Sequence, residues 1–321
     1  MKMKALKLAT LVFCATLFSL QVWADSVLTT IVVGNEPAGI VANPRLNKIY
    51  VALDADLKVA VINGETNQVS STIPLAGHPL AVAVNILTDR IYSTSCDFGT
   101  GQCSVYVIDS RTDTIIANIP LPTIQGIGLQ GIGVNPVTNR IYVSDGDNSR
   151  VYVIDGASNQ QINQFPVPSP AGVAVNPKTN RIYVASVGAA LFVFDGSNNS
   201  QIARVPMDSS TEQVATNFRL NRAYTTVDSN ELGIVNGANQ VVEKVPTEAF
   251  AHGVDVNLFN NKIYVANANS ASVTIVDGKT NRVVQTLPIP ANFPDGVTVN
   301  LVTGRTYITD FFSNIVIVLQ D

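Results

Sequence analysis

The chain has 321 residues, 46% of them hydrophobic, and a formal net charge of −4 at pH 7. This length and apolar content suffice for a large buried core, and the mild acidity argues against nucleic acid as a partner, because proteins that bind nucleic acid present basic surfaces. After the first 24 residues no stretch is long and apolar enough to span a bilayer, so we expect no membrane span there.

The first 24 residues predict a secretory signal peptide. Three lysines lie within the first seven residues, an apolar run follows from Leu8 to Val22, and Ala24 provides a small residue before a cleavage site at Asp25. This order is typical of export leaders, and the run is shorter than the ~20 residues of a spanning helix. We therefore expect an exported protein, periplasmic or secreted. Loss of the three lysines changes the net charge from −4 to −7.

A ten-residue motif recurs through the remaining sequence. It reads NPKTNRIYVA from Asn176, and near copies begin at Asn43, Asn135 and Asn257. The tyrosine of the motif returns at steps of 40 to 50 residues, in seven copies: Tyr50, Tyr92, Tyr142, Tyr183, Tyr224, Tyr264 and Tyr307. Self-similarity at this period is typical of propellers, in which each repeat forms one blade.

Each copy predicts four short strands, which residues 172–176, 181–185, 191–195 and 201–206 illustrate for the fourth copy. The first three strands are almost continuously apolar, as expected of strands covered on both faces. The fourth strand is more polar and ends in proline in six copies, which places it at the outer edge, because proline cannot donate to a ladder. The sequence thus predicts an all-β, seven-bladed propeller of four-stranded antiparallel blades, forming one domain over residues 25–321.

The turn after the first strand has its own signature. We interpret the asparagine that opens each motif as a turn former rather than a ligand. The position before the motif's Arg or Lys is Asn in five copies, Asp89 in the second and Gly304 in the seventh. These residue types tolerate positive φ, so we predict a left-handed backbone there.

The two ends of the repeat region are predicted to pair. Residues 26–34 align with residues 68–76, which form a fourth strand, whereas residues 314–320 form a third strand with no fourth strand after it. The strand at residues 26–34 therefore completes the last blade, which leaves no open sheet edge at the seam. Between the ends, Cys96 and Cys103 predict one disulfide in an exported chain, and a metal site is the rival interpretation.

The segments IYVA and IYVS, with VTIVDGKTNRVV at residues 273–284, resemble the YVTN-type β-propeller repeat from residue 26 to the C-terminus. The resemblance implies an exported or surface protein that binds or scaffolds. Some related propellers, such as streptogramin lyases and metal-dependent lactonases, are enzymes. No catalytic motif of these enzymes is matched, so the resemblance implies no catalytic residues.

Length variation predicts a binding face. The segments within the first and third turns of each copy hardly vary, whereas Pro120 to Asn135 spans 15 residues against 10 for Pro166 to Asn176. The hairpin that contains the two cysteines is also extended. In a four-stranded meander both variable connections emerge on one side, and insertions gathered there commonly mark a binding face, although neutral drift in exposed loops is the alternative.

Candidate site residues gather in copies five to seven of this face. Near the channel mouth we expect the residues before each first strand, which are Ala38, Leu80, Gln130, Ala171, Glu212, His252 and Asp295. Further polar candidates are Asp228, Asp255, Asn267 and Asp310, and aromatic candidates in the loops are Phe250, Phe293, Phe311 and Phe312. Aromatic rings beside carboxylates predict a ligand or partner patch, and the alternative is that the rings cover the blades while the acids are solvated.

Two functions remain open on these residues. The first is a non-catalytic, monomeric binding or scaffold protein that requires no cofactor and whose partner is a protein, peptide or small ligand. The second is a lyase or metal-dependent hydrolase with Glu212, His252 and Asp295 at the channel mouth. Carboxylates there, including Asp255 and Asp310, suggest a divalent cation such as Ca²⁺, but no linear calcium-loop spacing supports it.

Overall fold

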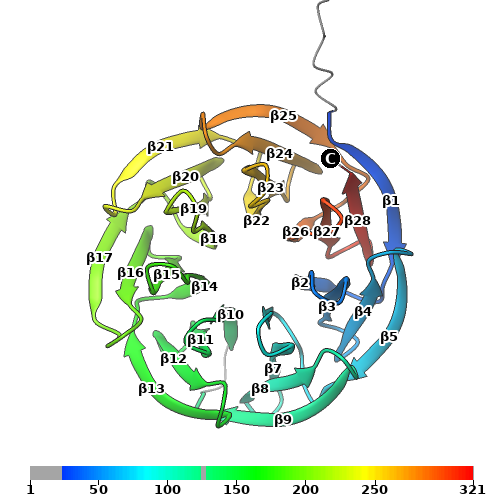
Figure 1. Ribbon diagram of the computed structural model, residues 1–321, viewed down its shortest axis with the longest axis vertical. Coiled ribbons are helices and arrows are strands. Elements are labelled where there is room, and N and C mark those ends of the chain that lie inside the picture. The colour runs from blue at the N-terminus through cyan, green and yellow to red at the C-terminus, as the bar shows by residue number, and fades with distance from the viewer. Residues whose placement is uncertain (1–23, 124–127, 321) are drawn as a thin grey trace, which may run out of the picture.

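The computed structural model describes residues 24–123 and 128–320. The described residues form strands, turns and bends but no helix, so none of them provides a helix capable of crossing a bilayer. The strands form seven four-stranded antiparallel sheets arranged as the blades of a propeller (Figure 1), as the sequence predicts. Except for Ala24, the predicted signal peptide lies outside the described residues.

The blades follow one another along the chain. Blades 1 to 3 are β2 (Pro37–Asn43), β3 (Lys48–Leu53), β4 (Lys58–Asn63) and β5 (Gln68–Pro74); β6 (Val82–Asn85), β7 (Arg90–Asp97), β8 (Gln102–Asp109) and β9 (Thr114–Leu121); β10 (Leu129–Asn135), β11 (Arg140–Asp145), β12 (Arg150–Asp155) and β13 (Gln160–Pro166). Blades 4 and 5 are β14 (Pro170–Asn176), β15 (Arg181–Ser186), β16 (Ala190–Asp195) and β17 (Gln201–Pro206); β18 (Thr211–Asn217), β19 (Arg222–Val227), β20 (Glu231–Asn236) and β21 (Val241–Pro246). Blade 6 is β22 (Ala251–Val256), β23 (Lys262–Asn267), β24 (Ser272–Asp277) and β25 (Arg282–Pro288). Blade 7 is β26 (Pro294–Asn300), β27 (Arg305–Asp310), β28 (Ile315–Gln320) and β1 (Ser26–Val32).

The predicted ring closure is confirmed. Strand β1 pairs antiparallel with β28, from Ser26 opposite Gln320 to Val32 opposite Ile315, and becomes the outer strand of blade 7. In Figure 1 the blue β1 lies against the red β28, so the two ends of the fold meet in one sheet. Because β1 covers β28, the seam leaves no unpaired edge of β28 that another chain can extend.

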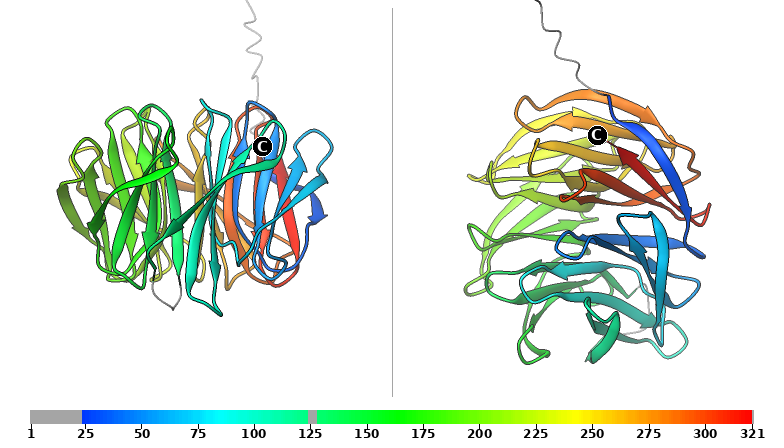
Figure 2. Two further views of the ribbon diagram at one scale, coloured as in Figure 1. Left: turned by 90° about the horizontal axis from the view of Figure 1, so that it is seen from below. Right: turned by 45° about the vertical axis from the view of Figure 1, so that its right-hand side comes forward.

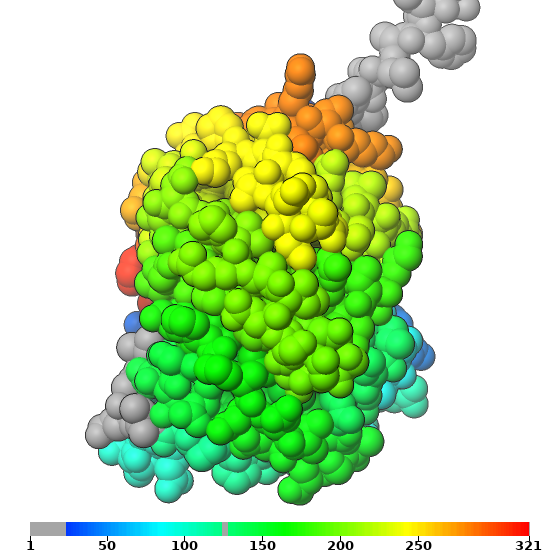
Figure 3. All heavy atoms as spheres, turned by 90° about the vertical axis from the view of Figure 1, so that its left-hand side faces the viewer, coloured from blue at the N-terminus to red at the C-terminus, as the bar shows by residue number. Residues whose placement is uncertain are grey.

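The hydrophobic core lies between neighbouring blades. The motif tyrosines are fully buried, and each packs into a cluster contributed by two blades. Tyr50 of blade 1, for example, packs in a cluster with Val82 and Ile91 of blade 2. Figure 3 shows the outcome at the side of the disc, where the outer strands form a continuous wall of side chains. Three apolar inner strands per blade are therefore explained by burial on both sheet faces.

The turn prediction is confirmed at the backbone. The φ angles are 51° at Asn47, 53° at Asp89 and 71° at Gly304, all in the left-handed region. The motif asparagine has two roles: Asn176 Oδ1 accepts from the N–H of Lys178 at 3.1 Å, and its Nδ2 donates to Oδ1 of Asn221 in the next blade at 3.0 Å. The sequence predicted the first role and missed the link between blades.

The charged residue of the motif also joins two blades. Lys48 Nζ contacts Oδ2 of Asp113 in the next blade at 2.8 Å, and the hydroxyl of Tyr50 donates to Oδ1 of the same carboxylate at 2.7 Å. At the seam, Lys262 Nζ contacts Oδ2 of Asp25 at 2.7 Å, and the hydroxyl of Tyr264 lies 3.1 Å from its Oδ1. Asp25, just before β1, thus occupies in blade 7 the place that Asp113 occupies in blade 2.

Length variation is concentrated on one face of the disc, as the sequence predicts. We call this the variable face; it is formed by the turns between second and third strands and by the connectors between blades. Both β7 and β8 have eight residues where most second and third strands have six, and Cys96 pairs with Cys103 across them in a disulfide. In the left view of Figure 2 the disc is seen from its side, and the loops that connect the strands lie at its two faces. The predicted disulfide is therefore confirmed.

Candidate functional site

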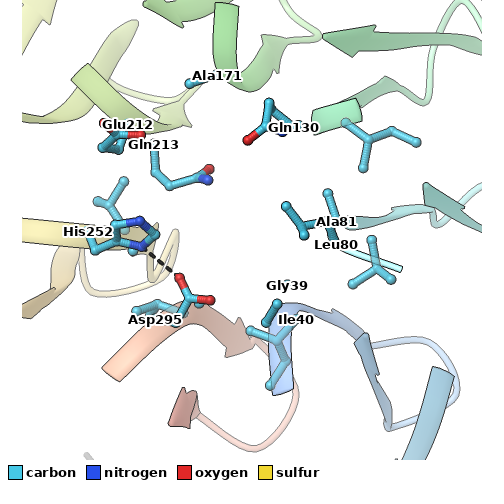
Figure 4. A pocket seen from close by; sticks show the side chains of 18 of the residues that line it. Gly39, Ile40, Leu80, Ala81, Gln130, Ala171, Glu212, Gln213, His252 and Asp295 are labelled. Carbon is cyan, nitrogen blue, oxygen red and sulfur yellow. Dashed lines mark ion pairs between the residues drawn. The ribbon is translucent and has the colours of Figure 1, made fainter. Parts of the chain in front are cut away.

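A cavity of about 250 Å³ lies at the centre of the ring, and its walls come from the innermost strands of all seven blades. Every residue predicted to border the channel mouth lines it: Ala38, Leu80, Gln130, Ala171, Glu212, His252 and Asp295. Figure 4 shows that the polar side chains Glu212, Gln213, His252 and Asp295 occupy one sector, while Ile40, Leu80 and Ala81 form the facing wall. The charged side chains of the cavity thus lie on the side of blades 5 to 7, and the facing wall is apolar apart from the amide of Gln130 in blade 3.

A β-bulge places these polar side chains. The pairing of β22 with β23 skips from Ala251 to Val254, and β18 and β26 skip at the corresponding point. Extra residues in one strand re-aim side chains, here toward the ring axis. The sequence placed these residues just before their strands, but β18, β22 and β26 each begin one residue before them, so the bulge includes them.

The second residue of the bulge is glycine in most blades because neighbouring inner strands approach closely. A Cβ on Gly253 would lie 2.0 Å from the carbonyl oxygen of Asp295. Blade 5 has Gln213 at this position, and its side chain extends into the cavity (Figure 4). Sequence reasoning missed Gln213. The signal was its departure from the glycine that other copies carry.

The histidine and the aspartate of blades 6 and 7 form an ion pair across the cavity wall. Nδ1 of His252 lies 2.6 Å from Oδ1 of Asp295, and the two side chains are 21% and 17% exposed. The hydroxyl of Thr226 in β19 donates to the carbonyl of His252 at 2.9 Å and holds this backbone in place. Burial by itself lowers the pKa of His252, but Asp295, Glu212 and Asp228 outweigh it, so the pKa is raised.

The remaining carboxylates of this sector favour the protonated form more than free side chains do. Burial raises the pKa of Glu212, and the neighbouring His252 opposes the rise only in part. Burial likewise raises the pKa of Asp228. The cavity wall therefore carries two carboxylates, Glu212 and Asp295, beside one imidazole, and Asp228 is near enough to raise the pKa of that imidazole. A cation that enters the cavity gains a partly dehydrated negative surface.

Four predicted polar residues do not line the cavity, and Asp228, in the turn between β19 and β20, is one of them. Asp255 lies deeper in the channel wall and accepts from the N–H of Val299 in the next blade at 2.8 Å, while burial raises its pKa to about 6. Asn267 is buried and donates to Thr274 within its own blade. Asp310 is buried and accepts from the N–H of Phe293 at 2.9 Å. Asp255 and Asp310 thus accept from backbone N–H groups, and Asn267 donates to side chains within its own blade.

The predicted aromatic residues form one cluster at the rim. Ring centroids are 6.1 Å apart for Phe250 and Phe293, 5.3 Å for Phe293 and Phe312, and 5.3 Å for Phe311 and Phe312. Phe312 is 65% exposed, and Phe311 also lines the cavity. Phe250, held at φ 59°, lies 5.5 Å from the ring of His252, so the aromatic rim and the polar sector are continuous.

Metal binding has no geometric support. Across residues 24–123 and 128–320, no group of three or more His, Cys, Asp or Glu side chains is arranged to hold a metal ion. The Ca²⁺ considered from the sequence stays a prediction. The second histidine of the folded region, His78, lies 2.9 Å from Oδ1 of Asp54 and stacks on Phe98, away from the cavity, in a structural role.

Comparisons with known proteins do not narrow the identity. No protein-family model matches the chain, and no curated protein matches it. The class of protein is therefore given by the fold: a seven-bladed β-propeller with a central cavity that opens beside an aromatic rim.

Proposed function

We propose that this chain is an exported, non-catalytic propeller of the YVTN-repeat type, which binds a partner at its variable face through blades 5 to 7. The observation that carries the proposal is the continuity of two surfaces, the cavity with Glu212, His252 and Asp295 and the rim of four phenylalanines. Aromatic side chains concentrate binding energy at interfaces, and concave sites with a few polar groups are the usual ligand sites.

Export rests on two observations. The leader pattern ends at Ala24, and Cys96 and Cys103 form a disulfide, which persists in oxidising compartments. The binding role rests on where the repeats differ. The packing positions between blades stay alike in all seven copies, and the distinct residues lie at the cavity and on the loops above it.

The proposal is tested by partner recovery. The chain from Asp25 onward, tagged at its C-terminus, is cross-linked in envelope extract, alongside the double variant Phe311→Ala/Phe312→Ala and the control Phe259→Ala. Phe259 is 63% exposed on the opposite face, a close match to Phe312 at 65%. We expect recovered partners to be lost in the double variant only. Equal recovery from all three proteins would refute the assignment of this face.

An enzymatic function is the second candidate, because the structure brings His252 and Asp295 to 2.6 Å at a cavity wall beside Glu212. An imidazole oriented by a carboxylate is a common general base, and the neighbouring carboxylates raise the pKa of His252. Turnover of a lactone and ester panel, lost in His252→Gln and unaffected by Phe259→Ala, would establish it. An inactive panel, with a melting curve indifferent to chelator and Ca²⁺, leaves the binding role.

A further inference from the structure

Charge is divided between the two faces of the disc. Acidic residues gather in the turns and connectors of the variable face: Glu36, Asp54, Asp56, Asp97, Asp147, Asp208, Asp228 and Glu248. The basic residue of each repeat instead begins a second strand and so lies at the opposite face: Lys48, Arg90, Arg140, Arg181, Arg222, Lys262 and Arg305. The variable face is therefore negative because the fold places its recurring cations elsewhere.

The cations that do reach the variable face lie away from its centre. Four described lysines and arginines extend there from third and fourth strands, namely Lys58, Arg150, Arg204 and Lys244. None of them lines the cavity, and Lys244 already pairs with Asp208. Among the described residues that line the cavity, the one side chain that can carry a positive charge is His252, which is paired with Asp295. Glu212 is thus a carboxylate at the cavity wall that faces no lysine or arginine.

The shape of the site favours a cation on an apolar stem. In addition to Glu212 and Asp295, the cavity wall includes the apolar side chains of Leu80, Ile132 and Val254. The rings of Phe250 and Phe293 stand at its mouth, where aromatic faces attract organic cations. A lysine or arginine side chain satisfies both parts, because its methylene stem contacts apolar walls while its head reaches a carboxylate.

The exposed rim argues for a polypeptide rather than a free amine. Phe312 is 65% exposed and contacts Phe293 and Phe311, so the apolar surface extends beyond the cavity itself. A small amine would fill the cavity and leave this surface in water. A peptide segment that presents a basic residue beside an apolar one covers both.

We propose that the variable face binds a basic peptide segment of a partner protein, inserting one lysine or arginine into the central cavity toward Glu212 and Asp295 while a neighbouring apolar side chain packs on Phe293, Phe311 and Phe312. The proposal deepens the binding role above and rests on it.

Selection from a random octapeptide display library tests this without knowledge of the partner. The chain from Asp25 onward is the bait, with Glu212→Gln and Phe312→Ala as test variants. Glu65→Gln and Phe259→Ala are matched controls, because both residues are exposed on the opposite face. We expect enrichment of Lys or Arg next to Leu, Phe or Ile with the unaltered bait and both controls, and loss of that enrichment with either test variant.

The best selected peptide then gives a quantitative test. Replacing its basic residue by norleucine, which keeps the stem and removes the charge, should weaken binding at least tenfold, as should Glu212→Gln, and higher salt should weaken the unaltered pair. Absence of enrichment, peptides without basic residues, or equal affinity of the norleucine peptide would each overturn the proposal. If partner recovery depends on Phe311 and Phe312 while these charge tests fail, only the cationic ligand class is wrong.

Discussion

Asp25 holds the seam of the ring, and its substitution gives the sharpest test of how the fold closes. Its side chain is 2% exposed, and Lys262 of blade 6, 19% exposed, lies 2.7 Å from it. Its carboxylate also contacts the Tyr264 hydroxyl at 3.1 Å, and the amide of Gln285 donates to its backbone carbonyl at 2.8 Å. Asp25→Ala removes both side-chain contacts and leaves the backbone contact in place.

The magnitude follows from these two contacts. A hydrogen bond to a charged group contributes about 1.5–3 kcal/mol, and removing one partner of a buried ion pair costs about 3–5 kcal/mol. Because a fifth of Lys262 remains exposed, water compensates part of the lost attraction, and the low end applies. We expect Asp25→Ala to lower the free energy of unfolding by about 3 kcal/mol. For a chain of this size that corresponds to roughly 6 °C in melting temperature.

Other blades supply a control built from the same parts. Where the motif has arginine, the matching turn residue is asparagine: Arg222 Nη1 donates to Oδ1 of Asn281 at 2.7 Å and to the Gly278 carbonyl at 2.6 Å. Lysine at this position occurs with Asp25 or Asp113. Asp25→Asn should therefore lower the free energy of unfolding by about 1 kcal/mol. The double variant Asp25→Asn/Lys262→Arg should recover most of this loss, since a guanidinium can reach both an asparagine Oδ1 and a turn carbonyl.

Urea unfolding and calorimetry of the chain from Asp25 onward measure these changes. Asp113→Ala, which removes the equivalent contacts within the continuous chain, shows how much of the loss is special to the seam. An Asp25→Ala protein that unfolds at the same urea concentration as the unaltered chain would refute the reasoning. A double variant no more stable than Asp25→Asn would refute the pairing of lysine with aspartate and arginine with asparagine.

Three further outcomes are expected. Because the pKa of Asp255 is raised to about 6 in the fold, the folded state binds more protons than the unfolded chain, and stability is lost as pH rises from about 4 through 6. Relative to the unaltered chain, Asp255→Thr, which copies Thr298 of blade 7, should gain about 2 kcal/mol in free energy of unfolding as pH rises from about 4.5 to about 7.5. His252 is present in both proteins, so its contribution cancels in this comparison; a difference that stays constant with pH contradicts the prediction. Cys96→Ala/Cys103→Ala should lower the free energy of unfolding, measured in urea, by about 2 kcal/mol. Reductant should destabilise the unaltered chain and leave the variant unchanged; equal sensitivity of the two proteins to reductant contradicts this. Deleting residues 25–34 removes β1, so cooperative melting should be lost, and an unchanged melting curve contradicts the closure of the ring.

The regular part of the fold was predictable because it repeats. Seven copies average out local ambiguity, so strand order, the closing strand and the turn at positions such as Asn47 and Gly304 follow from alignment alone. The disulfide followed from a lone pair of cysteines. Contacts between blades were less accessible, since the partner of Asn176 lies about 45 residues away and its identity requires the angle between blades.

The candidate site was predictable by position and less so by role. The residues predicted to precede each first strand do line the cavity, and the four phenylalanines do cluster. In the sequence, Asp255 and Asp295 were equally good candidates for the channel mouth. Two residues separate Asp255 from His252 along β22, and this distance is enough to remove Asp255 from the cavity lining. Gln213 was missed because the glycine that stands at its position in most copies was not compared across the repeats.

The bulge explains why the distinctive chemistry lies where it does. Along an inner strand, residues such as Val254 and Val256 pack between blades, so a change there disturbs two blades together. The bulged residue lines the cavity and belongs to none of the clusters between blades, so the fold constrains its identity less than that of Val254 or Val256. Ala38 in blade 1 and His252 in blade 6 occupy the same backbone geometry with different chemistry. A repeat that must stay uniform to close into a ring thus keeps variable side chains at the bulges of six blades in one cavity, which is the physical reason to seek its function there.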